Sequence, residues 1–142
     1  MSYWLVKSEP ETYGWHQFIQ QGRAVWDGVR NYQARNNLMA MQPGDLVLFY
    51  HSVTKPAVVG LARVVRGAYP DPTVTKVPNR WVVVELEPVL ALDKPVSLGQ
   101  IKADPRFAAI ALIRQSRLSV MPVRPDEFDR ILELGTLVDG DQ

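Results

Sequence analysis

Residues 45–50 read DLVLFY, and this run decides the fold class. After Asp45 every side chain is apolar, so neither face of the predicted strand can lie against water. We therefore place this strand in the middle of a sheet or inside a barrel. The preceding Pro43-Gly44 is typical of a tight turn.

The segments on either side of this run predict a mixture of strands and helices. Residues with the β-branched and aromatic content of strands occur at 3–7, 57–65, 81–90 and 117–123. Helices are predicted at 13–20 (Thr12 as cap, Gly22 as stop), from an Asn31 cap to about residue 41, at 98–102 as a short turn, and at 125–134 with Pro125 first. Residues 69–79 contain three prolines and are typical of an exposed loop.

The order of these elements favours an α+β fold. Strands and helices do not alternate regularly, which argues against a doubly wound parallel sheet. We expect a curved, mostly antiparallel sheet or small barrel with flanking helices. The 142 residues, 46% of them hydrophobic, suit one domain over residues 1–142 with a single core.

Composition excludes several classes of protein. The chain has no cysteine, which removes disulfide frameworks, thiolate nucleophiles and cysteine-based zinc sites and is compatible with a cytoplasmic location. No apolar run approaches the roughly 20 residues that cross a bilayer. The first residues lack the basic and long apolar regions of a signal peptide. We therefore expect a cytoplasmic protein without a membrane partner, and we favour a monomer.

The sequence also lacks the common motifs of cofactor and catalytic sites. Neither GxGxxG nor GxxxxGK[ST] occurs, and the two histidines, His16 and His51, are not in an HExxH pattern. His51 and Ser52 are adjacent, but neighbours on a strand point to opposite faces, so they do not form a nucleophile–base pair. We expect no cofactor, no metal site and no catalytic residue.

One segment is unusual in its chemistry. Residues 26–37 read WDGVRNYQARNN, which combines aromatic rings with amide and guanidinium groups. Rings can stack on a flat heterocycle, amides can pair with the edge of a base, and arginine can bind phosphate. The alternative is that Trp26 and Tyr32 are core aromatics and Asn31 is only a helix cap.

Two further segments are candidates for ligand contacts. Residues 7–10 read KSEP at the end of the first predicted strand, where a loop can carry function on a rigid scaffold. Residues 114–119 read RQSRLS, a basic and hydroxylic stretch suited to phosphate contacts. An ordinary solvated strand end is the alternative for the second segment.

Four separated blocks together resemble the EVE domain family. They are YWLVKSEP (residues 3–10), WDGVRNYQARN (26–36), GD with FYHS (44–45 and 49–52) and SRLSV (116–120). The family belongs to the PUA-like group and is similar to YTH and ASCH domains. The resemblance implies a PUA-like pseudo-barrel with flanking helices. It also implies a module that reads modified bases, notably 5-methylcytosine and its oxidised forms in DNA, and in some relatives modified RNA.

The resemblance implies a base pocket and a backbone-binding surface. A base flipped out of the stack would enter a pocket formed by Lys7, Ser8, Trp26, Val29, Asn31, Tyr32, Tyr50, His51 and Ser52. Phosphates would be held by Arg30, Arg35, Arg114, Arg117 and Ser119. The expected partner is nucleic acid, and the expected function is recognition without catalysis.

Two alternatives remain open. ASCH-type relatives resemble amide hydrolases that act on acylated cytosine with a lysine and an acidic residue, and Lys7 with Glu9 is the comparable pair here. A pocket of this kind would also suit a small-metabolite or protein-binding module.

Overall fold

The computed structural model of the chain describes residues 1–136; the last six residues of the expected domain lie outside the described part. The strands are β1 (Tyr3–Ser8), β2 (Ala24–Trp26), β3 (Leu46–His51), β4 (Ala57–Pro70), β5 (Val82–Ser97) and β6 (Val120–Val123). The helices are α1 (Trp15–Gln21), α2 (Tyr32–Ala40), α3 (Leu98–Ala103), α4 (Ala111–Arg114) and α5 (Pro125–Gly135), with a 3₁₀ turn η1 (Pro105–Phe107).

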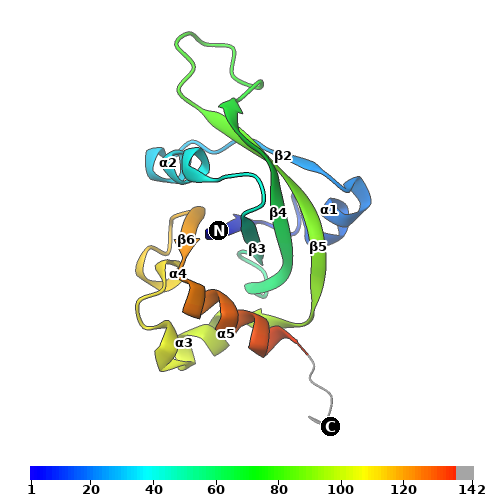
Figure 1. Ribbon diagram of the computed structural model, residues 1–142, viewed down its shortest axis with the longest axis vertical. Helices are drawn as coiled ribbons and strands as arrows, with labels where there is room; N and C mark the ends of the chain where they lie inside the picture. The colour runs from blue at the N-terminus through cyan, green and yellow to red at the C-terminus, as the bar shows by residue number, and fades with distance from the viewer. Residues whose placement is uncertain (137–142) are drawn as a thin grey trace.

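The strands form one six-stranded sheet in the order β2-β5-β4-β3-β1-β6. β1 and β3 run parallel, from Tyr3 opposite Leu46 to Ser8 opposite His51, and the other neighbours are antiparallel. The predicted α+β class with a mostly antiparallel sheet is confirmed, as is the inner position of β3. The long strands β4 and β5 twist strongly and extend past the rest of the sheet (Figure 1).

The core is built around Phe49 of β3, which is fully buried. Phe18 of α1 stacks on it at 5.3 Å between ring centroids, and Trp15 and Trp26 meet it edge-on at 5.3 and 5.6 Å. Gly60 of β4 lies opposite Phe49 in the pairing of β3 with β4. A Cβ atom at Gly60 would lie 2.5 Å from the Trp15 ring, so glycine permits α1 to pack directly on the sheet.

Asp45 joins the beginnings of the parallel strands β1 and β3. Its buried carboxylate accepts hydrogen bonds from Trp4 Nε1 at 3.0 Å, Ser2 N at 3.2 Å and Gln42 N at 3.0 Å. Burial raises the pKa of Asp45, but these hydrogen bonds outweigh burial and hold the pKa below its usual value. The charged form is thus the one that fits this part of the fold.

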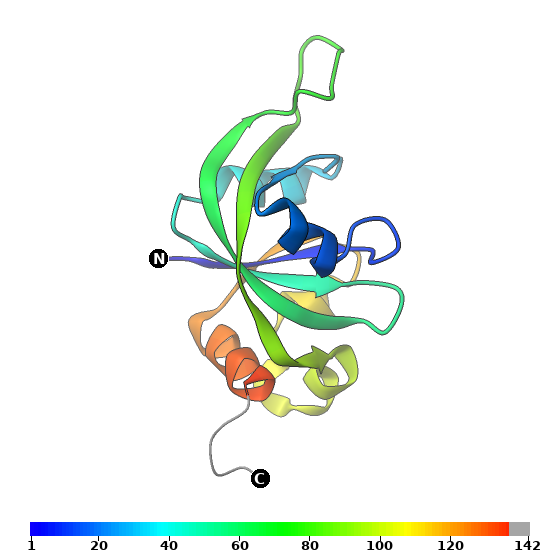
Figure 2. The same ribbon diagram turned by 90° about the vertical axis from the view of Figure 1, so that its right-hand side faces the viewer.

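The helices lie around the two ends of the twisted sheet. α1 and α2 lie on opposite sides of β4 and β5, and α3, α4 and α5 gather at the other end (Figures 1 and 2). α2 packs against β4, β5 and β6, and α5 packs against β5. None of the helices in residues 1–136 has the length and apolar character needed to cross a membrane.

Several predicted helix ends agree with the structure, and others do not. Gly22 ends α1 with φ of 71°, Asn31 caps α2, and Pro125 begins α5, as predicted. Thr12 as the cap of α1 is wrong: its N–H and that of Tyr13 bond to Glu9 O in a turn, and Gly14 is the cap.

Some strand ends also differ, and three short elements were not predicted. The last strand begins at 120 rather than 117 because residues 115–118 form a turn, with Leu118 N donating to Gln115 O. β5 continues to residue 97, well past the predicted 90. β2, η1 and α4 have three or four residues each, too few to give a periodic pattern.

Candidate nucleic-acid-binding site

A cavity of about 940 Å³ lies between the end of β1, the turn Glu9–Tyr13, β2 and the segment Asp27–Arg30. Four of the nine residues predicted for the base pocket and two of the five predicted to hold phosphate line it. The predicted site residues that line it are Lys7, Ser8, Trp26, Val29, Arg30 and Ser119. They arrive from three separate parts of the chain, because β1 pairs with β6 on one side and the chain returns through β2 on the other.

Lys7 holds a fixed positive charge at the edge of the cavity. Its Nζ donates to Ser116 O at 2.7 Å and lies 6.0 Å from the centroid of the buried Tyr50 ring. Its backbone N–H bonds to Ser119 O at 3.0 Å, so this side of the cavity is tied to β1. Burial lowers the pKa of Lys7.

Ser8 shapes the cavity through the neighbouring turn. Its hydroxyl donates to Tyr13 O, while the N–H groups of Thr12 and Tyr13 bond to Glu9 O. The donor capacity of Ser8 is therefore used within the protein, and its oxygen keeps acceptor capacity for a ligand.

Trp26 is a core residue that also contributes to the cavity wall. Only 9% of the residue is exposed, and its ring meets Phe49 at 5.6 Å and Tyr13 at 6.2 Å, edge-on in both contacts. Val29 is 7% exposed and lines the same wall. Trp26 is thus a core aromatic, as one of the two interpretations of the sequence has it, and it also borders the cavity.

Arg30 is fixed at the rim by a buried carboxylate. Asp71, just after β4, accepts hydrogen bonds from Arg30 Nη1 at 2.9 Å, Gly28 N at 3.2 Å, Thr73 N at 2.8 Å and Thr73 Oγ1 at 2.6 Å. Burial raises the pKa of Asp71, but the hydrogen bonds from Thr73, Arg30 and Gly28 outweigh it and lower the pKa to about 2. Gly28 has φ of 77°, a conformation that favours glycine.

Two residues of α2 that were predicted for the pocket lie outside this cavity. Asn31 Oδ1 accepts from Ala34 N at 2.9 Å as a helix cap, and Asn31 lines a smaller cavity of about 350 Å³ together with Arg117. Tyr32 is 51% exposed and contacts Trp81, with the ring centroids 4.9 Å apart and the planes tilted by 31°; the Arg35 guanidinium lies 4.9 Å from the centroid of the Tyr32 ring. Among the arginines predicted to hold phosphate, Arg114 bonds to Ala108 O within its own turn.

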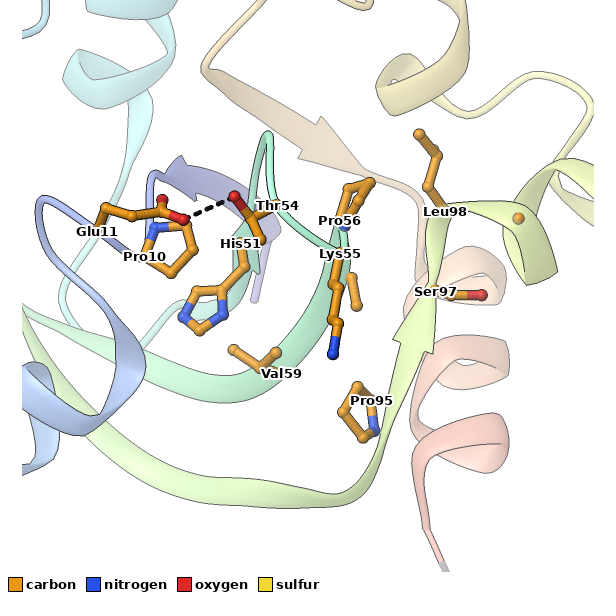
Figure 3. Close-up of a pocket in the computed structure, with 12 residues that line it drawn as sticks. Pro10, Glu11, His51, Thr54, Lys55, Pro56, Val59, Pro95, Ser97 and Leu98 are labelled. Carbon is orange, nitrogen blue, oxygen red and sulfur yellow. Dashed lines mark hydrogen bonds between the residues drawn. The ribbon is translucent and has the colours of Figure 1, made fainter.

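His51 and Ser52 lie on the other side of the Glu9–Tyr13 turn. His51 Nε2 accepts from Trp15 N at 3.0 Å, and its side chain lines a different cavity of about 710 Å³ (Figure 3). Ser52 N donates to Ser8 O. Burial lowers the pKa of His51, and the Glu11 carboxylate opposes that effect. The backbones of residues 51–52 and Ser8 are therefore neighbours, but the His51 side chain lines a different cavity from Lys7 and Ser8.

The turn Glu9–Tyr13 forms a wall between the two cavities, and we call it the partition segment. Glu9, Thr12 and Tyr13 line the larger cavity, and Pro10 and Glu11 line the cavity of His51. Glu11 bonds to Thr54 across the His51 cavity (Figure 3). Five consecutive residues thus border two separate hollows.

The model of the EVE domain matches residues 2–134 of the chain. This protein belongs to the EVE domain family. Mouse thymocyte nuclear protein 1 is 35% identical over 94% of this chain and 73% of the relative. A crystal structure of a protein from Agrobacterium tumefaciens is 38% identical, covers 100% of this chain and 98% of its own, and has a TM-score of 0.93.

A third relative was solved with nucleic acid. The human THYN1 protein in complex with 5-methylcytosine-containing DNA is 31% identical to this EVE domain, with a TM-score of 0.87 over 97% of this chain and 99% of that one. An ASCH protein from Zymomonas mobilis has a TM-score of 0.59 at 11% identity, which shows likeness of fold alone. The predicted family and its similarity to ASCH domains are confirmed.

The structure of this EVE domain adds residues that sequence reasoning missed. Tyr13 and Asp27 line the cavity, and Asp71 positions Gly28 and Arg30 from a distant loop. Asp27 stood within the motif that drew attention, but nothing in the sequence connects Asp71 to residue 30. Within residues 1–136, no group of three or more histidine and acidic side chains is arranged to hold a metal ion.

Proposed function

We infer that this EVE domain is a non-catalytic module that recognises a modified base in nucleic acid, namely 5-methylcytosine or an oxidised derivative in DNA. The observation that carries the inference is its likeness, over 97% of the chain, to a protein solved with 5-methylcytosine-containing DNA. Modified RNA is the second polymer to test. The absence of cysteine suits the cytoplasm, where we propose that the protein acts.

The larger cavity has the chemistry that a flipped base needs. Flipping a base costs a few kcal/mol, which stacking and hydrogen bonds to the base edge can offset. Carboxylates accept from the exocyclic amine of cytosine. Glu9 and Asp27 line the cavity, and their carboxylates have no hydrogen-bond partner within residues 1–136. We assign Asp27 as the acceptor for that amine, because it stands beside Trp26 and Val29.

The preference for a methylated base is expected to be modest. A methyl group that leaves water for an apolar wall gains about 0.8 kcal/mol, which corresponds to roughly a fourfold difference in affinity. Val29 and the exposed edge of Trp26 supply the apolar wall here. Tight binding must therefore come from the whole nucleotide rather than from its methyl group.

Fluorescence anisotropy with matched oligonucleotides tests the proposal. Duplexes that differ only in one cytosine, 5-methylcytosine or 5-hydroxymethylcytosine should bind at low salt, the modified ones more tightly. Asp27→Asn should weaken binding by about tenfold, since it removes an ionised acceptor. The matched control is Asp129→Asn, an exposed carboxylate on α5. If neither DNA nor modified RNA binds, the inference is wrong.

Trp26→Ala is a poor test of binding for a structural reason. Removing a buried aromatic ring costs about 3–5 kcal/mol of stability, so a loss of binding would follow from unfolding. Lys7→Met keeps most of the side-chain length and removes the charge at the cavity edge together with the hydrogen bond to Ser116 O.

Amide hydrolysis is the second candidate, and one observation favours it. Lys7 and Glu9 line the same cavity, and burial lowers the pKa of Lys7, which is the direction that a lysine base needs. Incubation with N4-acetylcytidine followed by chromatography for cytidine tests this. Turnover that Lys7→Met abolishes would replace the proposal of a non-catalytic reader.

A further inference from the structure

Four side chains form a continuous series of cation–ring and ring–ring contacts beside the cavity. The Arg30 guanidinium lies 5.7 Å from the centroid of Trp81, Trp81 lies 4.9 Å from Tyr32, and the Arg35 guanidinium lies 4.9 Å from Tyr32. We call this set the cation–aromatic ladder. It joins α2 to the base of the protruding loop that connects β4 to β5. These two strands lie side by side in Figure 1.

The ladder stands outside the hydrophobic core. Tyr32 is 51% exposed and Trp81 is half-buried, and neither ring belongs to the core cluster or packs against it. Two large rings are therefore kept at the surface. Core packing does not explain them, whereas a surface that binds flat or charged groups does.

The two ends of the ladder differ in charge. Arg30 lines the cavity and is paired with the buried Asp71 carboxylate. Arg35, at the far end, bonds to Arg80 O and Asn36 Oδ1 and has no carboxylate partner in the described part of the chain. Arg80 likewise has no carboxylate partner there. Positive charge is thus available at the end away from the cavity.

We propose that the ladder is a second subsite, which binds the nucleotide next to the flipped base on the same strand. Its base lies against the Tyr32–Arg35 end, and its phosphate lies between Arg35 and Arg80. The subsite rests on the proposed function, because it needs a strand that enters the larger cavity.

The physical chemistry of the ladder fits this ligand. Every base has a π face, so a ring or a planar guanidinium can take any neighbouring base. A guanidinium held over a ring is ordered before it meets phosphate, and it keeps N–H groups at its edge for the anion. Because Asp71 fixes Arg30, the distance between ladder and cavity is also fixed, so both subsites can engage one strand.

Three variants separate the ladder from the cavity. Tyr32→Ala removes the outer ring, and Arg35→Ala removes the unpaired charge. Tyr69→Ala is the matched control: Tyr69 also carries a stacked arginine, Arg66 at 3.8 Å, but both bond to the Glu85 carboxylate. Thermal unfolding of each variant verifies that it remains folded.

Binding is measured by anisotropy against a 5-methylcytosine duplex at several salt concentrations, and by NMR titration against 5-methyl-2′-deoxycytidine. Tyr32→Ala should weaken duplex binding by about tenfold at every salt concentration. Arg35→Ala should reduce the slope of log K against log salt by about 0.9. Neither change should alter nucleoside binding, and Tyr69→Ala should leave both ligands unaffected.

The outcomes distinguish the ladder from the cavity. If wild type binds the duplex and both ladder variants bind it equally well, the ladder proposal is wrong and the proposed function stands. If the ladder variants lose the nucleoside as well, the ladder is part of the cavity wall and not a separate subsite. If wild type binds no nucleic acid, both proposals are wrong.

Discussion

Asp71 holds Gly28 and Arg30, two residues of the WDGVRNYQARNN segment, in their positions beside the cavity. Its carboxylate is fully buried and receives its hydrogen bonds from two segments, around Gly28 and Thr73. Without that carboxylate, Gly28 N and the Arg30 guanidinium would lose the oxygen to which both donate. A buried donor left without its acceptor costs about 1–3 kcal/mol, so stability as well as shape depends on this residue.

We expect Asp71→Asn to lower the free energy of unfolding at neutral pH by about 2 kcal/mol, the equivalent of a pKa lowered from 3.8 to about 2. The folded pKa lies below the unfolded one, so this stability is complete above about pH 5 and is lost as pH falls through about 2. Urea unfolding of both proteins across that range measures it. The difference in the free energy of unfolding between wild type and variant should become smaller in acid. A difference that stays constant would contradict the role of the charge. Asp129→Asn is the exposed control.

Gly60 is the other residue whose identity the packing fixes. A methyl group there would lie 2.5 Å from the Trp15 ring, which is held between Phe18 and Phe49. We expect Gly60→Ala to cost about 1–3 kcal/mol. Gly67→Ala, also on β4, places its methyl group 3.6 Å from the nearest atom and serves as the control. Equal midpoints in thermal unfolding for the two variants would contradict this account.

At the scale of elements, α2 explains why one stretch of sequence does not form one site. A helix turns its side chains through 3.6 positions per turn, so Ala34 and Leu38 face the core while Tyr32 and Arg35 face outward. The buried stripe of this helix was predictable from spacing alone. The separate surfaces reached by Trp26, Asn31 and Tyr32 were not, because they depend on distant residues such as Arg117 and Trp81 that lie beside the start of the helix.

Asn31 gives a test of this separation. We expect Asn31→Ala to cost about 1 kcal/mol, because Ala34 N loses its acceptor, and Asn31→Ser to recover most of that cost, since serine also caps helices. Chemical denaturation measures both. If Asn31→Ser keeps stability but loses affinity for the modified duplex, the Asn31 amide contacts the ligand in addition to capping α2.

The sheet shows which elements a sequence can reveal. β3 was predictable because every position after Asp45 is apolar, and α5 because Pro125 marks its start. β2 has three residues, and its role as a cavity wall comes from pairing with β5 some 60 positions away. The parallel pairing of β1 with β3 likewise depends on contacts that no local pattern records.

At the scale of the whole molecule, a net charge of +1 limits how strongly the protein can attract nucleic acid. Affinity must come from a few cations near the site that are not neutralised by carboxylates. Lys7, Arg35, Arg80 and Arg117 meet that condition within residues 1–136.

We therefore expect a shallow salt dependence. Four phosphate contacts give a slope of log K against log salt of about −3.6 for duplex DNA, and this is the steepest value the site supports. Anisotropy titrations between about 50 and 200 mM salt measure the slope. A steeper value would mean that phosphates also contact further exposed cations, such as Lys102 of α3 and Arg106 of η1.

The partition segment has a further consequence for the molecule as a whole. Because the residues from Glu9 to Tyr13 line both cavities, a displacement of this turn changes the shape of both of them. A compound that binds in the His51 cavity and displaces the partition segment would therefore change the affinity of the larger cavity for its ligand. Thermodynamic linkage makes the effect mutual: a ligand in the larger cavity would change the affinity of the His51 cavity for that compound by the same factor.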